Sequence, residues 1–289
     1  MNRLWVGLSL VVAIGFGTSA PAQAPPSWIA PTAPFKIADN LYYVGTEGIS
    51  SYLITTRAGH VLIDGAMPTS AKLIEASITK LGFKITDVKV LLNTHAHFDH
   101  TGGLAELKLD TGATMAASAG DRVALESGTY PGSEEVTAFN FAPVKVDRVL
   151  KDGDTVRLGG AVLTANVTPG HTAGCTSWTF PVKVDGVRRQ ALVYCSTSVA
   201  ANRLVSKTRD PQYPGIVENY RKTFARLKTM KADIFLAPHA EQFGLAGKRA
   251  KLGSGGPNPF VDPTELARAV LQSQADFNRD LARQEAAAK

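Results

Sequence analysis

The chain has 289 residues, of which 44% are hydrophobic and 19% charged. This composition is ordinary for a globular protein, and the sequence shows neither a repeat nor a disordered block of charges. The formal charge of +6 is modest, and the lysines and arginines are scattered without a basic and aromatic motif, so we expect no nucleic-acid binding. A positive field of this size favours small anionic ligands.

The first 24 residues are predicted to be a secretory signal peptide. Arg3 precedes an apolar stretch from Leu4 to Phe16, and small residues end in Ala22-Gln23-Ala24. Because this stretch is shorter than the roughly 20 residues that span a bilayer, a membrane anchor is disfavoured. We therefore expect a periplasmic protein of one domain, residues 25–289, with no stable membrane insertion.

Strands and helices are predicted to alternate along the rest of the chain. Apolar runs and turn signals mark the strands, and apolar residues at helical spacing mark the helices. The predicted strands are 40–44, 51–55, 60–64, 88–93, 114–117, 145–150, 161–168, 176–182 and 190–194; the predicted helices are 69–81, one within 215–230 and one from about 263. This succession is typical of an α/β (α+β) fold in which two mixed β-sheets pack face to face with helices outside.

Four residues of metal-ligand type are packed into the run His95-Ala96-His97-Phe98-Asp99-His100, which follows the predicted strand 88–93. Imidazole nitrogens and carboxylates are ligands that zinc takes. Ligands at these spacings cannot share one face of a helix or a strand, so we expect an irregular loop bent around a metal centre. Independent packing of four such side chains explains this density poorly.

Two more histidines follow an apolar run and a proline. His171 comes after Pro169-Gly170, and His239 comes directly after Pro238. Proline ends a strand and fixes a turn, so both imidazoles are expected to project from strand ends. Taken alone, each could equally be a satisfied polar group. His60 lies beside Gly59 in a predicted hairpin turn and is expected at the surface.

The sequence leaves two interpretations open for each of three further side chains. Asp64 closes an apolar strand, where it could cap a turn or orient a metal-bound imidazole. Symmetric pairing about the turn at 184–187 would bring Cys175 and Cys195 close together, and an oxidising compartment permits a disulfide. Directly opposed strand residues fit disulfide geometry poorly, so the pair could also stay unbonded.

These residues resemble the metallo-β-lactamase superfamily, whose signature H-x-H-x-D-H stands here as His95, His97, Asp99 and His100. Further segments resemble the third subclass of class B β-lactamases: Trp28 with 34–35, 43–46, 62–68, 169–174 and 238–239. The resemblance runs from Trp28 to the final helix. It implies a four-layer αβ/βα sandwich with two Zn²⁺ ions per chain in a groove between the sheets.

By this resemblance, one zinc ion takes His95, His97 and His171, and the other takes Asp99, His100 and His239. A hydroxide that bridges the metals would hydrolyse the β-lactam amide bond of penicillins, cephalosporins and carbapenems, which confers antibiotic resistance. Asp99 is also expected to act catalytically, by assisting proton delivery to the leaving nitrogen. The protein is expected to act as a monomer.

Ser196, Ser198 and Asn202 are expected to bind the substrate carboxylate, although solvation of a loop would explain them equally well. Phe139 and Phe141 could wall the groove or pack locally. If the alignment were shifted by one residue, Cys195 would take the position now assigned to Ser196 and would be a metal ligand.

The main alternative is a lactone or thioester hydrolase on the same scaffold. Such relatives usually place a bridging aspartate at the end of a late strand, and the matching residues 194–198 contain no carboxylate. A zinc-binding protein without activity is a second alternative. A serine β-lactamase is disfavoured, because the chain has no S-x-x-K with its partner motifs.

Overall fold

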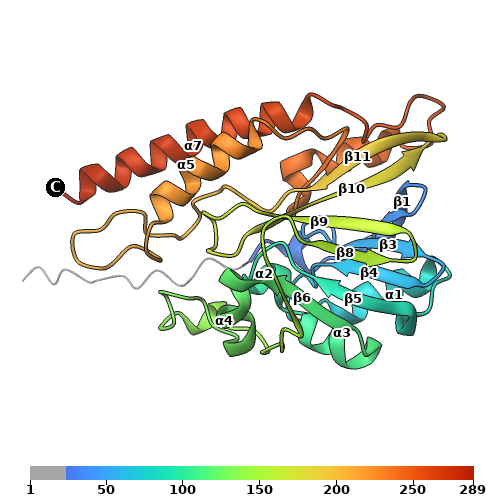
Figure 1. Cartoon of the computed structure of the whole chain (residues 1–289), viewed down its shortest axis with the longest axis horizontal. Helices are drawn as coiled ribbons and strands as arrows, with labels where there is room; N and C mark the ends of the chain where they lie inside the picture. The colour runs from blue at the N-terminus through green and yellow to red at the C-terminus, as the bar shows by residue number, and fades with distance from the viewer. Residues whose placement is uncertain (1–23) are drawn as a thin grey trace, which may run out of the picture.

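The computed structural model describes residues 24–289, so the predicted signal peptide lies outside the described part except for its last residue. Two β-sheets pack face to face, and helices cover both outer faces (Figure 1). This is the predicted sandwich of mixed sheets. Among the described residues, no helix is long and apolar enough to cross a membrane.

One sheet has seven strands, arranged in sequence order. Neighbours are antiparallel from β1 to β4 and parallel from β4 to β7. The strands are β1 (Phe35–Ala38), β2 (Leu41–Tyr43), β3 (Tyr52–Thr56), β4 (Gly59–Ile63), β5 (Val88–Leu92), β6 (Thr114–Ser118) and β7 (Arg148–Leu150).

The other sheet has five strands in the order β12-β11-β10-β9-β8. Only the β11–β12 pair is parallel. The strands are β8 (Thr155–Leu158), β9 (Ala161–Val167), β10 (Thr176–Val184), β11 (Val187–Val193) and β12 (Ile234–Leu236).

The helices form the two outer layers (Figure 1). Helices α1 (Ala71–Lys80), α3 (Leu104–Thr111) and α4 (Ala119–Ser127) lie on the seven-stranded sheet, and α5 (Ile216–Leu227) and α7 (Glu265–Ala287) lie on the five-stranded sheet. Two short helices, α2 (Phe98–Thr101) and α6 (Leu245–Lys251), complete the fold.

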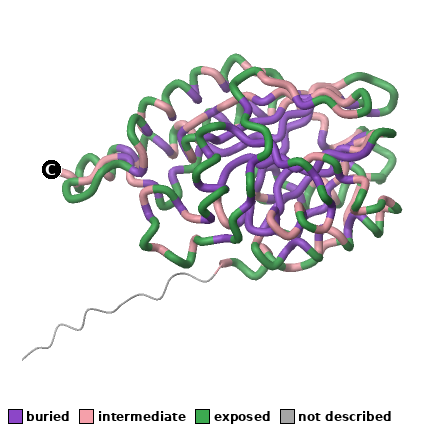
Figure 2. Tube along the Cα trace, turned by 60° about the horizontal axis from the view of Figure 1, so that its bottom comes forward, coloured by how far each residue is buried: buried purple, intermediate pink, exposed green. Residues whose placement is uncertain are grey.

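Strand β4 shows why the seven-stranded sheet is buried on both faces. Side chains alternate along a strand, so Val61 and Ile63 enter the core between the sheets while Leu62 packs with Ile74 and Ile78 of α1. A strand covered on both sides is buried at every position, as β4 is. In Figure 2 the buried residues accordingly run through the centre of the molecule.

The hairpin prediction is confirmed, with a two-residue turn between Val184 and Val187. Asp185 and Gly186 both have positive φ, 50° and 76°, as this tight turn requires. Cys175 and Cys195 lie beyond the strand ends and form a disulfide with a Cα–Cα distance of 5.8 Å. In the register of the hairpin, position 195 is one residue away from direct opposition to 175, so the geometric objection to a bond does not apply.

The expectation for His60 was wrong. The residue pairs with Thr55 inside the sheet, is 6% exposed, and meets the edge of the Phe83 ring with a centroid distance of 4.9 Å. The turn ends one residue earlier than predicted. His60 therefore shares the face of β4 that carries Leu62 and packs toward the outer helices.

Candidate metal centre

The predicted ligands meet where strands of both sheets end. His95 and His97 lie in the loop that follows β5, while Asp99 and His100 lie in the single turn of α2. The run is thus a loop plus one helical turn rather than a wholly irregular loop. His171 lies between β9 and β10, and His239 lies three residues beyond β12. Carboxyl ends of strands are where α/β folds place their chemistry.

Two overlapping sets of side chains could each hold a metal ion. One set is His95, His97 and His171, and the other is His95, Asp99 and His100; within each, the ligand atoms lie within 4.8 Å of one another. The Nε2 atoms of His95 and His171 are 3.1 Å apart. Because the sets share His95, the structure places two candidate sites next to each other.

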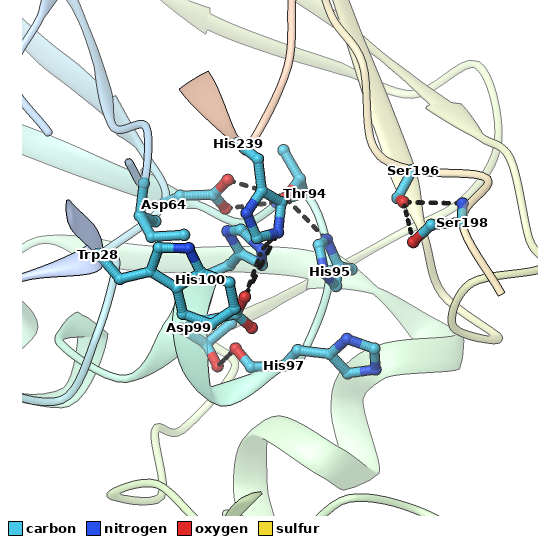
Figure 3. Close-up of polar contacts among 12 residues, drawn as sticks. Trp28, Asp64, Thr94, His95, His97, Asp99, His100, Ser196, Ser198 and His239 are labelled. Carbon is cyan, nitrogen blue, oxygen red and sulfur yellow. Dashed lines mark hydrogen bonds and ion pairs between the residues drawn. The ribbon is translucent and has the colours of Figure 1, made fainter. Parts of the chain in front are cut away.

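His239 joins the second set. Its Nε2 atom lies 3.2 Å from His100 Nε2 and 3.4 Å from Asp99 Oδ2. Asp99 Oδ2 is also 3.2 Å from His100 Nε2. Figure 3 shows these three side chains turned toward one another, with Asp64 and Thr94 nearby and Ser196 and Ser198 across the site. All six predicted ligands therefore gather at one place.

The hydrogen bonds of His95 and His171 indicate that the site suits a cation. His171 Nδ1 lies 2.8 Å from the Ser198 carbonyl oxygen, which can only accept, so this nitrogen carries the proton. The Thr94 hydroxyl donates to Asp64 at 2.8 Å and is free to accept from His95 Nδ1 at 3.1 Å. Both Nε2 atoms then present lone pairs to each other at 3.1 Å, which an ion between them would relieve.

Asp64 orients His95 through Thr94, which supports the second of the two predicted roles. Its buried carboxylate also accepts the Thr94 backbone N–H at 2.6 Å. The backbone of Asp64 has φ of 65°, an unfavourable conformation for a residue other than glycine. Burial raises the pKa of Asp64 to about 6, against the opposing effects of His100 and of the Thr94 hydrogen bonds.

Burial and charge set the protonation of the cluster. Burial and the neighbouring imidazoles hold the pKa of His95 and His97 well below the usual range. Burial lowers the pKa of His171 to about 4 and that of His239 to about 3. Burial would raise the pKa of Asp99, but the adjacent His100 holds it well below its usual range. Burial would lower the pKa of His100, but Asp99 raises it above the usual value. The other four imidazoles stay neutral, and neutral imidazoles with a carboxylate form a donor set that fits zinc.

A groove of about 300 Å³ opens onto the cluster. Its walls are mainly apolar and include the four aromatic side chains Trp28, Phe98, Tyr130 and Phe139. Ser198 also lines the groove. The groove therefore combines the ligand cluster with an apolar surface and a hydroxyl group, as small-molecule sites commonly do.

A sequence model of the metallo-β-lactamase superfamily matches residues 44–184. The solved structure of BJP-1, a subclass B3 metallo-β-lactamase of Bradyrhizobium japonicum, is 50% identical to this chain, with a TM-score of 0.88. The match covers 91% of this chain and 99% of BJP-1. The chain belongs to the metallo-β-lactamase superfamily. This match confirms the predicted fold and the predicted resemblance to the third subclass.

A second solved structure that resembles this superfamily member is also a metallo-β-lactamase. The metallo-β-lactamase FEZ-1 of Legionella gormanii is 42% identical, with a TM-score of 0.83, and the match covers 89% of this chain and 98% of FEZ-1. By contrast, the hydroxyacylglutathione hydrolase of Rhodospirillum rubrum is 36% identical over 131 residues, 45% of this chain. This chain matches only 42% of that relative's length.

The three predicted substrate-binding residues of this metallo-β-lactamase superfamily member differ in how exposed their side chains are. Ser198 is exposed and lines the groove, whereas Ser196 is 4% exposed and bonds Ser198. The prediction for Asn202 is corrected: its side chain is 2% exposed, accepts the Tyr130 hydroxyl at 2.6 Å and donates to the His171 carbonyl at 2.9 Å. Because both groups of its amide are engaged in these contacts, Asn202 stabilises Tyr130 and the His171 backbone and is not available to a substrate.

The two aromatic residues predicted to wall the groove also differ in exposure. Phe139 lines the groove, while Phe141 is 7% exposed and packs in the core beneath the outer helices. Tyr130, which the residue pattern did not single out, lies with its ring centroid 4.6 Å from that of His97. Cys195 is engaged in the disulfide, so it is not a metal ligand.

Proposed function

We propose that this chain is a zinc-dependent β-lactamase. It hydrolyses the amide bond of penicillins, cephalosporins and carbapenems, acts in the periplasm as a monomer, and confers resistance to these antibiotics. The observation that carries the proposal is the match to BJP-1, which spans 99% of that enzyme at 50% identity.

Two zinc ions are proposed to occupy the centre. His95, His97 and His171 would hold one ion, and Asp99, His100 and His239 would hold the other. Zinc supplies Lewis acidity and makes water a nucleophile near neutral pH. The tautomers of His95 and His171 support this assignment, because each has its Nδ1 atom engaged by the protein and its Nε2 atom directed into the cluster.

The residues of the chain then position the reactants and move a proton. Asp99 is proposed to accept the proton that the attacking water loses and to pass it to the amide nitrogen as the C–N bond breaks. Its position within the second ligand set, 3.2 Å from His100, supports this role. Asp64 and Thr94 keep His95 oriented while charge changes in the site.

We propose that two parts of the groove wall bind the substrate. The Ser198 hydroxyl donates to the carboxylate that β-lactams carry, and Trp28 and Phe139 contact their apolar substituents. Trp28 lies with its ring centroid 5.1 Å from that of His239, so a substrate held by this wall lies close to the second ligand set.

A thioester hydrolase is the second candidate, because the hydroxyacylglutathione hydrolase of Rhodospirillum rubrum is 36% identical over part of the chain. Two features weigh against it. Residues 194–198 provide no carboxylate for a bridging ligand. Within the described residues, no lysine or arginine lines the groove to pair with the two carboxylates of glutathione.

The discriminating experiment compares kcat/KM of the zinc-loaded protein for a chromogenic cephalosporin, S-lactoylglutathione and an acyl-homoserine lactone. We expect the cephalosporin to be favoured at least roughly 100-fold, a difference of about 2.7 kcal/mol in transition-state stabilisation. A higher kcat/KM for the thioester or the lactone would transfer the proposal to that class.

A further inference from the structure

Asp121 is a buried carboxylate that the proposed reaction does not use. It lies in the first turn of α4 and is 1% exposed. Within the described residues, no lysine or arginine forms an ion pair with it. A buried carboxylate without a cationic partner is costly and needs compensating hydrogen bonds.

The hydrogen bonds of Asp121 reach two separate loops of the metal centre. Its Oδ2 atom accepts the backbone N–H of Ala96 at 2.9 Å, and its Oδ1 atom accepts the backbone N–H of Gly174 at 3.0 Å. Ala96 stands between His95 and His97, and Gly174 comes three residues after His171. One rigid carboxylate therefore links the two loops that carry the first ligand set.

The packing around this link leaves little room for adjustment. A Cβ atom on Gly174 would lie 2.2 Å from the Asp121 backbone nitrogen, and one on Gly120 would lie 2.5 Å from the Ala173 carbonyl oxygen. The Ser118 hydroxyl donates to the Gly174 carbonyl oxygen at 2.5 Å. Both backbone polar groups of Gly174 are thus held by the start of α4.

We propose that Asp121 is a positioning residue that sets the separation of the two ligand loops and thereby the zinc affinity of the site formed by His95, His97 and His171. The inference rests on the proposed metal centre. The Nε2 atoms of His95 and His171 are only 3.1 Å apart, so a small shift of either loop changes their distances to a shared ion.

The test uses Asp121→Asn, which preserves shape and removes one acceptor. An amide oxygen can accept one loop N–H, but the amide nitrogen is a donor and faces the other N–H without a bond. We expect the zinc affinity of the site formed by His95, His97 and His171 to fall about 10- to 100-fold. Competition between metal-free protein and a chromophoric zinc chelator measures this affinity, and the visible spectrum of the cobalt-loaded protein reports the changed coordination.

Asp233→Asn is the matched control. Asp233 also accepts a backbone N–H, that of Gln190 at 2.7 Å, but it lies just before β12, at the end opposite to His239. We expect it to retain wild-type zinc affinity. A merely structural role for Asp121 would lower the melting temperature of the metal-free protein and leave zinc affinity unchanged, which would overturn the inference.

The remaining outcomes are also decisive. If the wild-type protein binds no zinc, the proposed metal centre fails and the inference fails with it. If wild type binds zinc and Asp121→Asn binds it with the same affinity, the inference fails while the proposed metal centre stands. Should Asp121→Asn not fold, Ser118→Ala loosens the same contact on Gly174, and we expect a severalfold loss of zinc affinity; unchanged affinity in that variant would contradict the proposal.

Discussion

At the scale of single residues, the ligand cluster shows how the fold prepares side chains for an ion. His95 and His171 each use Nδ1 within the protein and direct Nε2 into the cluster. The buried Nε2 atom of His97 and the buried Nδ1 atoms of His100 and His239 have no hydrogen-bond partner among the described residues. The fold thus buries these three ring nitrogens without giving them a protein partner.

Replacement of His97 by alanine should remove one zinc ligand. Loss of a residue that only supports a ligand commonly reduces metal affinity or activity 10- to 100-fold, so loss of a ligand should lower kcat/KM at least about 100-fold. Zinc content by elemental analysis and cephalosporin turnover are the measurements. The control is His60→Leu, because His60 is buried away from the cluster and should not affect zinc content. Near-normal turnover by zinc-loaded His97→Ala would contradict the site.

Ser198→Ala should weaken substrate binding. A hydrogen bond to a charged group contributes about 1.5–3 kcal/mol, so KM for a cephalosporin should rise roughly tenfold or more while kcat changes little. Ser196→Ala is the control, since Ser196 is 4% exposed and should have the smaller effect. Steady-state kinetics separate the two parameters. Equal KM values for wild type and Ser198→Ala would rule out this contact.

The predictability of these residues depended on how distinctive their chemistry is. Four ligand-type residues in six positions are rarely explained by packing, so the location of the cluster could be predicted. Asn202 could not be placed, because a polar residue in a loop carries no signal for the direction of its side chain. His60 was misplaced because a residue next to a predicted turn gives no sign that Phe83, distant in the sequence, covers it.

At the scale of secondary-structure elements, the disulfide ties the start of β10 to the residues after β11. The double substitution Cys175→Ser and Cys195→Ser should lower the free energy of unfolding by about 3 kcal/mol, as loop-closure entropy predicts for cysteines 20 residues apart. Urea unfolding measures the change. Zinc content should stay the same, and an unchanged unfolding free energy would contradict the expected contribution.

The start of α7 provides a prediction of pH dependence. Asp262 accepts the Thr264 N–H at 2.9 Å and contacts Arg268 at 2.7 Å, and these bonds hold its pKa well below the usual value. A carboxylate with a lowered pKa stabilises the fold above the unfolded value, near 3.8, and loses this effect as the pH falls further.

The replacement Asp262→Asn keeps the shape of this helix start and removes the charge. Wild type should exceed the variant by about 0.5 kcal/mol at pH 6, since the pair is exposed, and the difference should shrink by pH 3. Thermal unfolding at both pH values tests this. A difference that grows toward pH 3 would contradict the assignment.

Many elements of the fold were predictable, whereas several short strands and the helices α4 and α6 were not. Strands β4 and β5 and helices α1 and α5 have clear periodic apolar patterns, and the structure confirms them. Strands β1 and β8 have only four residues each, too few for a period to be recognised. The helical turn α2 was missed because its sequence is dominated by ligand residues.

At the scale of the whole molecule, the ligand cluster joins the two sheets. His95 follows β5 of the larger sheet, while His171 and His239 follow β9 and β12 of the smaller one. This convergence of distant segments is not visible in local sequence patterns; it was expected only from the resemblance to a known family. Ions held by these residues would bind the folded state alone and stabilise it.

The proposed function requires this joint site to hydrolyse β-lactams with zinc. The most direct measurement is carbapenem and cephalosporin hydrolysis by the purified protein, as isolated, after treatment with EDTA, and after zinc is restored. We expect turnover that is lost on chelation and recovered with zinc. No β-lactam turnover by protein shown to be loaded with two zinc ions, or turnover unaffected by complete zinc removal, would contradict it.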